Sequence, residues 1–144
     1  MDMLTEMFDL QAKLNARIGY KTDELRESFD PLRAGTWLND YIVAASNELE
    51  ELRDCMFWKH WCVEARAGRR FEIHDLQNAR VEVIDLLFFW ISMAQCLGLN
   101  ASDVHELYRQ KLAVNHQRQE CDYSMRAKTE DDNKNIGLGR TGQP

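Results

Sequence analysis

Two pairs of acidic residues interrupt otherwise apolar stretches of this sequence. Glu48 and Glu51 lie three positions apart in NELEEL, and Glu82 and Asp85 lie three apart in VEVIDLL. Residues at this spacing share one face of an α-helix, so each pair points in one direction from its helix. Burying four carboxylates together without a cation is strongly unfavourable, because charge repulsion adds to desolvation. The chain must therefore keep these faces in water or pack two helices around a divalent metal ion.

The type of donor predicts the kind of metal. Ligation by oxygen alone favours a hard ion, and Mg²⁺ takes a few carboxylates together with waters and substrate phosphate oxygens; Mn²⁺ is the alternative. A di-iron bundle would use Glu-x-x-His on two helices, whereas Glu51 and Asp85 stand at the corresponding positions here. The missing histidines weigh against iron. The second acidic pair is followed by the run LLFFWI, and this apolar context favours a metal site over a solvated helix edge.

Hydrophobic periodicity predicts an all-α fold with four main helices. Only two prolines and seven glycines interrupt the 144 residues, which favours helices over short strands. The segment around Asp30 and Pro31 is expected to be a connection, because proline disfavours helix at the residue before it. Apolar residues at helical spacing, with glycines as stops, place the helices at about 2–18, 36–58, 76–97 and 100–120.

The length of the chain suits one domain with its own core. We expect an all-α domain over residues 1–135 and a flexible tail over 136–144. The run from Leu86 to Ile91 places apolar groups around the whole circumference of the third helix, which a single covering layer cannot bury. A second copy of the chain is expected to cover the rest, so we predict a helical bundle that forms a homodimer.

Charge and cysteine usage argue against several other classes of protein. A formal net charge of −6 argues against a general nucleic-acid-binding protein, which would cluster Lys and Arg. The four cysteines form no CxxC pair, so a zinc ribbon is not expected and reduced cytoplasmic thiols are the simpler interpretation. The start MDMLTEMFDLQAKL lacks the features of an export signal, and the apolar run 86–99 is shorter than the roughly 20 residues that span a bilayer. We expect a cytoplasmic protein that binds neither membrane nor nucleic acid.

Together the acidic pairs resemble those of the all-α nucleotide pyrophosphohydrolase superfamily, whose MazG-like members carry ExxE and then ExxD on adjacent helices. Trp58 and Trp61, in the segment WKHW between the two pairs, resemble the tryptophan-containing insertion of the dimeric dUTPases rather than the shorter link of MazG. Gln11 and Asn15 match the LQ…LN helix of that family. The resemblance covers about residues 4–135.

The carboxyl-terminal part extends the resemblance. The family grips the triphosphate with Lys, Asn, Arg and Tyr, and the matching residues here are Lys111, Asn115, Arg118 and Tyr123. The sequence EDDN, which ends at Asn133, is similar to the family's EDN element. Each of these features also has a purely structural interpretation, as a core tryptophan, a solvated helix face or a polar turn. The family often has His where this chain has Phe88, so recognition of the base or sugar is expected to differ.

The resemblance implies a Mg²⁺-dependent enzyme that hydrolyses dUTP to dUMP and pyrophosphate, with dUDP as a further candidate substrate. All four acids would bind the metal, and Glu48 or Glu51 would act in catalysis by orienting a water and accepting its proton. The implied contacts of the base and sugar are Gln11, Asn15, Trp58, Trp61, Phe88 and Asn133. Two alternatives stay open: a MazG-like enzyme with different or broader base specificity, and a non-catalytic helical dimer that binds nucleotides.

Overall fold

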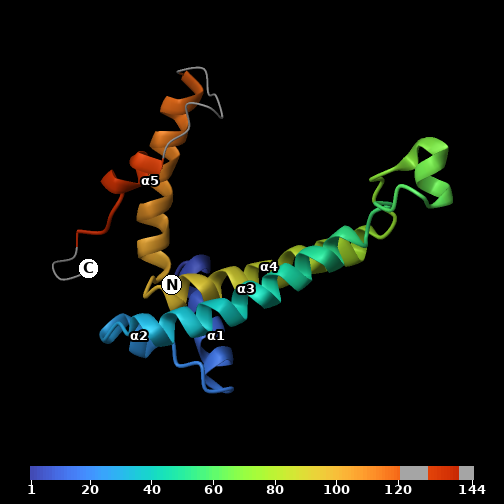
Figure 1. The fold of residues 1–144 in the computed structure, drawn as a ribbon. Helices are drawn as coiled ribbons and strands as arrows, with labels where there is room; N and C mark the ends of the chain where they lie inside the picture. The colour runs from blue at the N-terminus through green and yellow to red at the C-terminus, as the bar shows by residue number, and fades with distance from the viewer. Residues whose placement is uncertain (121–129, 140–144) are drawn as a thin grey trace.

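The computed structural model of the protein describes residues 1–120 and 130–139, and its long elements are all helices (Figure 1). Within these residues no strand forms, and the β pairing is an isolated antiparallel bridge between Met56 and Ile73. The predicted all-α fold is therefore confirmed. The α-helices are α1 (Met3–Ala16), α2 (Asp23–Glu27), α3 (Pro31–Arg53), α4 (Leu76–Cys96) and α5 (Ala101–Glu120), with a π-helical turn at Ala65–Arg69 and a 3-10 helix at Glu130–Asn135.

The helices α3 and α4 form one long antiparallel hairpin, which is the main body of the molecule (Figure 1). Residues 54–75 connect them at one end of this hairpin, and we call this connection the tip. The other three helices, α1, α2 and α5, gather at the opposite end, where α4 finishes (Figure 1). The acidic pairs therefore lie on two packed helices, as the sequence predicts.

Helix α3 begins at Pro31, about five residues before the start at Thr36 that we predicted. The Asp30 side chain accepts hydrogen bonds from the backbone N–H groups of Leu32 and Arg33, at 3.0 and 3.2 Å, and so caps the helix. Proline is well tolerated at the first helical position, because its missing N–H would have no partner there. The segment around Asp30 and Pro31, which we expected to be a connection, is therefore the start of a helix. An Asp-Pro sequence is compatible with either structure.

The tip has a defined structure, and most of its residues from 63 to 74 are exposed. Its two sides are joined by backbone hydrogen bonds, from Phe57 N to Glu72 O and from Phe71 N to Phe57 O, both 3.1 Å long. Arg69 donates twice to the Glu72 carboxylate, at 3.0 and 2.8 Å. These contacts close the tip on itself, so it extends the hairpin instead of folding back over α3 and α4 (Figure 1).

A small apolar core holds α1 against α4 and the start of α5. Its buried members are Phe8, Ile91, Ala94 and Ala101, with Leu4, Leu87, Leu99 and Val104 packed around them. The buried Gln95 side chain donates a 2.8 Å hydrogen bond to the Phe8 carbonyl, which fixes α1 along α4. This packing determines which side chains of α1 face the hairpin, and Gln11 and Asn15 are among those buried.

Helix α5 leaves the end of α4 at an angle of 96°. Gly98 makes this turn with φ of +74°, a left-handed conformation that other residues rarely adopt. Arg26 of α2 donates to the Gly98 carbonyl at 2.9 Å and also binds Asp103 of α5, so the turn is held on two sides. Within the described residues no single helix is long and apolar enough to cross a membrane, although α4 and α5 reach that length and composition as a bent pair.

Residues 130–139 return along α5 (Figure 1). Gly137 donates from its N–H to the Gln110 side chain and accepts from it through its carbonyl, both at 2.9 Å. Residues 136–139 of the predicted tail are therefore tied to α5, whereas residues 140–144 lie outside the described residues.

Candidate active site

Three of the four predicted metal ligands form one acidic cluster between α3 and α4. Carboxylate oxygens of Glu48, Glu51 and Glu82 lie within 4.8 Å of one another. Glu82 is only 8% exposed, although it is an acidic side chain on the most apolar helix. Asp85, one turn further along α4, is not part of this cluster but lines the cavity beside it together with Glu48.

The acidic cluster lacks the positive charge that a buried group of carboxylates needs. The Oε2 atoms of Glu48 and Glu82 are buried without a hydrogen-bond partner, and the ion pairs among the described residues do not involve the cluster. Burial raises the pKa of Glu48 to about 7, and the neighbouring carboxylates of Glu82 and Glu51 add to this rise. Unpaired buried oxygens in an all-oxygen site fit a hard divalent cation.

A cavity of about 520 Å³ opens beside the acidic cluster. Its volume lies within the roughly 300–1,000 Å³ range of pockets that bind small molecules. It combines carboxylates, amides and apolar side chains from three helices, and its lining consists of Gln11, Leu14, Asn15, Ile18, Tyr41, Glu48, Asp85, Phe88 and Phe89. Of the residues predicted from the sequence, two acids, both amides of α1 and Phe88 therefore meet in one cavity.

The two predicted amide residues are connected to each other and to α4. Gln11 Nε2 donates to Asn15 Oδ1, and Asn15 Nδ2 donates to the Ser92 hydroxyl, each over 2.9 Å. Ser92 Oγ in turn donates to the Phe88 carbonyl at 2.8 Å. All three polar side chains are buried, so this chain of hydrogen bonds fixes the positions of the amides in the cavity wall.

Sequence reasoning missed Tyr41 and Ser92 as polar residues of this region. Tyr41 is 7% exposed, lines the cavity, and its hydroxyl has no hydrogen-bond partner among the described residues. Burial raises the pKa of Tyr41 to about 12, with Cys96 and Tyr20 adding to the shift, so the hydroxyl stays protonated. Both residues could have been found by helical position, because Tyr41 stands seven before Glu48 and Ser92 seven after Asp85.

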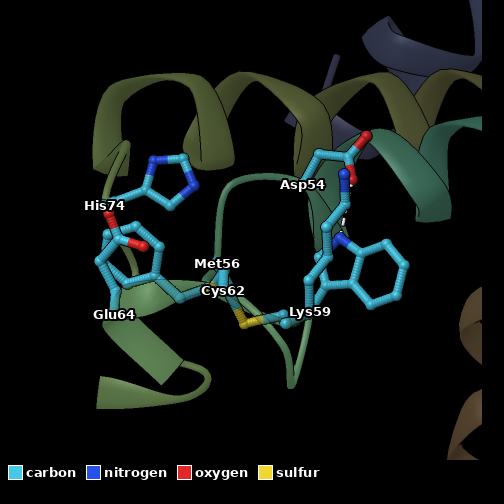
Figure 2. A pocket seen from close by; sticks show the side chains of 8 residues that line it. Asp54, Met56, Lys59, Cys62, Glu64 and His74 are labelled. Atoms are coloured by element: carbon cyan, nitrogen blue, oxygen red, sulfur yellow. Dashed lines mark hydrogen bonds between the residues drawn. The ribbon is translucent and has the colours of Figure 1, made fainter. Parts of the chain in front are cut away.

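The predicted base contacts Trp58 and Trp61 lie in the tip and do not line this cavity. Trp58 Nε1 donates to Asp54 at 2.8 Å, and the two indole rings meet edge to face at 6.0 Å. Trp58 instead lines a separate cavity of about 310 Å³, which Figure 2 shows between Asp54 and Lys59 on one side and His74 on the other. Within a single chain, the tryptophans therefore lie apart from the cavity of about 520 Å³ beside the acidic cluster.

Three of the four predicted phosphate-binding residues, Lys111, Asn115 and Arg118, belong to the part of α5 that extends away from the hairpin (Figure 1). Lys111 Nζ donates to Asn133 Oδ1 at 2.7 Å, so two residues that the family pattern matched are in contact. Asn115 is exposed and Arg118 is half-buried on the same helix. Tyr123 lies outside the described residues. Lys111, Asn115 and Arg118 do not line the cavity beside the acidic cluster.

Comparison with known proteins gives the family. A sequence model of the family described as dUTPase matches residues 3–95 of this chain. The chain belongs to this dUTPase family. The matched residues contain both acidic pairs, both tryptophans and every residue that lines the cavity of about 520 Å³, and they end before α5. The predicted resemblance is therefore confirmed, and with it the predicted class of enzyme, a nucleotide pyrophosphohydrolase.

Two relatives of this dUTPase-family chain are named for a different nucleotide. A dCTP pyrophosphatase of Enterobacteria phage T4 is 26% identical over 145 residues, which cover 85% of this chain and 83% of the relative. A dCTP pyrophosphatase of Enterobacteria phage LZ5 is 27% identical over 144 residues, with 85% and 84% covered. No solved structure matches this chain. The relatives agree with the family on a nucleotide substrate but differ in the base.

Proposed function

We propose that the protein hydrolyses dUTP to dUMP and pyrophosphate with the help of Mg²⁺. One observation carries the proposal: a single cavity joins the carboxylates of Glu48 and Asp85 to the buried amides of Gln11 and Asn15. The acidic end suits a metal-bound triphosphate, and the amide end offers the donors and acceptors that a pyrimidine edge requires. The two ends of the cavity match the two ends of a nucleotide.

The metal would be held by Glu48, Glu51, Glu82 and Asp85. The unpartnered Oε2 atoms of Glu48 and Glu82 support this assignment, because a cation would supply the charge that they lack. When bound, Mg²⁺ supplies charge stabilisation for the phosphate oxygens and for the pyrophosphate as it leaves. Mn²⁺ accepts the same oxygen ligands and is the alternative metal.

The carboxylates of α3 would perform the proton transfer. Glu48 or Glu51 orients a water and accepts its proton while the water oxygen forms a bond to phosphorus. The bond between the α- and β-phosphoryl groups breaks, and the electron pair of that bond leaves with the product whose phosphorus the water does not attack. Asn47 donates a 3.2 Å hydrogen bond to Glu51 Oε1, which holds this exposed carboxylate at the edge of the acidic cluster.

A second candidate substrate is dCTP, because both phage relatives are named dCTP pyrophosphatases and match 85% of this chain. Uracil and cytosine share a carbonyl at position 2 and differ at positions 3 and 4, where uracil carries N3–H and O4 and cytosine carries N3 and an amino group. The amides of Gln11 and Asn15 offer both donors and acceptors to such an edge. Phe88, at the position where the family often has His, lines the same cavity.

A substrate panel tests the proposal. Purified protein is incubated with Mg²⁺ and each of dUTP, dCTP, dTTP, dATP and dGTP, and initial rates of pyrophosphate release are measured. We expect dUTP to give the highest kcat/KM. A higher value for dCTP would replace dUTP by the second candidate. Equal hydrolysis of dATP or dGTP would contradict both and favour the broader MazG-like activity, and no release from any of them would favour the non-catalytic nucleotide-binding dimer.

We also propose that the enzyme is a homodimer. Large apolar side chains along the α3–α4 hairpin are about half exposed, more than a solvated surface of this size normally carries. They are Ile42, Val43, Leu49, Val81, Val83, Ile84 and Trp90. The predicted roles of the tryptophans in the tip and of the basic residues on α5 depend on such a second copy, because neither group lines the cavity of its own chain.

Light scattering coupled to gel filtration tests the dimer. The expected mass is twice the 16.9 kDa of one chain. Replacing Val83 and Ile84, which lie at the middle of the exposed apolar face of α4, by Lys is expected to shift the protein toward the monomer. A clear monomer for the wild-type protein would contradict this part of the proposal.

A further inference from the structure

Ser92 stands at the end of the hydrogen-bond chain that fixes the two amides of α1. It is 0% exposed, and its hydroxyl lies between Asn15 Nδ2, at 2.9 Å, and the Phe88 carbonyl, at 2.8 Å. These contacts join α1 to α4 across 77 positions of sequence. We call the three side chains Gln11, Asn15 and Ser92 the amide relay.

The hydrogen bonds of the relay orient both amides. Ser92 Oγ gives its single hydrogen to the Phe88 carbonyl, so toward Asn15 Nδ2 it acts as the acceptor. Asn15 must therefore turn its NH₂ group toward Ser92 and its oxygen toward Gln11. Gln11 must then present Nε2 to that oxygen, over 2.9 Å. The acceptor that is left over is Gln11 Oε1, which none of these three bonds uses.

The relay lies at the end of the cavity away from the acidic cluster. Ser92 follows Asp85 by seven positions on α4, and Tyr41 precedes Glu48 by seven positions on α3. Seven helical residues span about 10.5 Å along the axis, and both helices therefore carry their polar groups about that far from the acids. This separation suits a nucleotide whose phosphates are at the acidic end and whose base is at the relay.

We propose that Ser92 is a positioning residue that determines base selectivity by fixing Gln11 Oε1 as the acceptor of the base-binding end. The inference rests on the proposed function. With this polarity the site selects a pyrimidine that can donate a hydrogen bond, from N3–H in uracil or from the 4-amino group in cytosine. A base of the same size without such a donor leaves Gln11 Oε1 unpaired in a buried site.

A nucleotide of 2-pyrimidinone isolates this effect. This base has hydrogen at position 4 in place of oxygen or an amino group, and its N3 carries no hydrogen, so it matches the pyrimidines in shape but cannot donate. We expect the wild-type enzyme to hydrolyse 2-pyrimidinone deoxyriboside triphosphate with kcat/KM about 10- to 100-fold below that of dUTP. Tripolyphosphate has no base, so its inhibition of dUTP hydrolysis measures phosphate binding at the acidic end alone.

The variant Ser92→Ala tests the role of the hydroxyl. Without Ser92 Oγ the Asn15 amide is free to turn round, and Gln11 can then present Nε2–H to N3 of 2-pyrimidinone. We expect the preference for dUTP over 2-pyrimidinone to fall to about 3-fold or less, while inhibition by tripolyphosphate stays unchanged. A residue with only a structural role would lower both rates together and leave their ratio as it is.

Ser46→Ala is the matched control. Ser46 Oγ makes the same kind of bond, to the Ile42 carbonyl at 2.8 Å, but it lies exposed on α3 outside the cavity. The ratio of kcat/KM for dUTP to kcat/KM for the 2-pyrimidinone nucleotide should not change in this variant.

The outcomes separate the inference from the function on which it rests. If the wild-type enzyme hydrolyses dUTP and the 2-pyrimidinone nucleotide equally well, the relay does not select the base, and this holds even if Ser92→Ala fails to fold. An unchanged ratio in folded Ser92→Ala would equally overturn the role of Ser92. If the wild-type enzyme hydrolyses no pyrimidine nucleotide at all, the proposed function fails and the inference fails with it.

Discussion

Replacing Glu48 by Gln is expected to lower kcat for dUTP hydrolysis by about 10³-fold or more while making the metal-free protein more stable. Activity falls because the acidic cluster loses a metal ligand and a proton acceptor. Stability rises because the neutral amide removes repulsion from Glu82 and Glu51, the neighbours that help to raise the pKa of Glu48 to about 7. The measurements are steady-state kinetics with Mg²⁺ and thermal unfolding with a chelator.

Glu50→Gln is the matched control for this experiment. Glu50 lies on the same helix and undergoes the same chemical change, but its carboxylate is exposed and pairs with Arg53 at 3.3 Å. Its loss should leave kcat unchanged and reduce stability only slightly, since exposed ion pairs contribute about 0–1 kcal/mol. If Glu48→Gln retained wild-type activity, or destabilised the metal-free protein as a lost structural contact would, the assignment of the acidic cluster as the metal site would be wrong.

The metal-free protein is expected to lose stability as the pH rises from about 4.5 to about 7. The folded pKa of Glu48, about 7, is above the ordinary value of 4.5, so in this window the folded state holds a proton that the unfolded state has released. That stabilising contribution is complete below about 4.5 and is lost as the pH passes through about 7. Calorimetry with a chelator across this range should give a falling Tm.

Saturating Mg²⁺ should reverse this trend. The metal binds the deprotonated carboxylates, so the increase in Tm that it causes should be small at low pH and large above about pH 7. At a concentration about 100 times its Kd, a ligand that binds only the folded state adds about 2.7 kcal/mol. In Glu48→Gln both the pH dependence and the effect of the metal should shrink. A Tm increase that is equal at every pH would contradict metal binding by these carboxylates.

The four main helices could be predicted because each buries a periodic apolar face. The start of α3 could not, since Asp30 and Pro31 fit a loop and a capped helix start equally well, and only the bonds from Leu32 and Arg33 to Asp30 decide between them. The direction of α5 was also beyond the sequence. Periodicity predicts that a helix follows Gly98, but its 96° angle to α4 comes from the turn that Arg26 and Asp103 hold.

The acidic cluster could be predicted because buried carboxylates need a cation. Packing α3 on α4 brings carboxylate oxygens of Glu48, Glu51 and Glu82 within 4.8 Å of one another. Asp85 was harder to place, because a spacing of three puts it near Glu82 without showing whether it points to the cluster or to the cavity. In the structure it lines the cavity.

Only part of the base-binding end of the cavity could be predicted from the sequence. Gln11 and Asn15 match the family pattern, whereas no pattern in the sequence indicates a role for Ser92 or Tyr41. Their roles depend on which helix packs against which, and this is a property of the tertiary structure. Trp58 shows the opposite case, since the family resemblance implies a contact with the base, but the tip places Trp58 at a separate cavity.

The measurement that tests the central claim most directly is ³¹P NMR of dUTP incubated with the purified protein and Mg²⁺. The account predicts that dUMP and pyrophosphate appear together in equal amounts, and that a chelator or the Glu48→Gln substitution stops both. Formation of dUDP with orthophosphate would contradict cleavage between the α- and β-phosphoryl groups. Unchanged turnover in the presence of the chelator would contradict the metal site at Glu48, Glu51, Glu82 and Asp85.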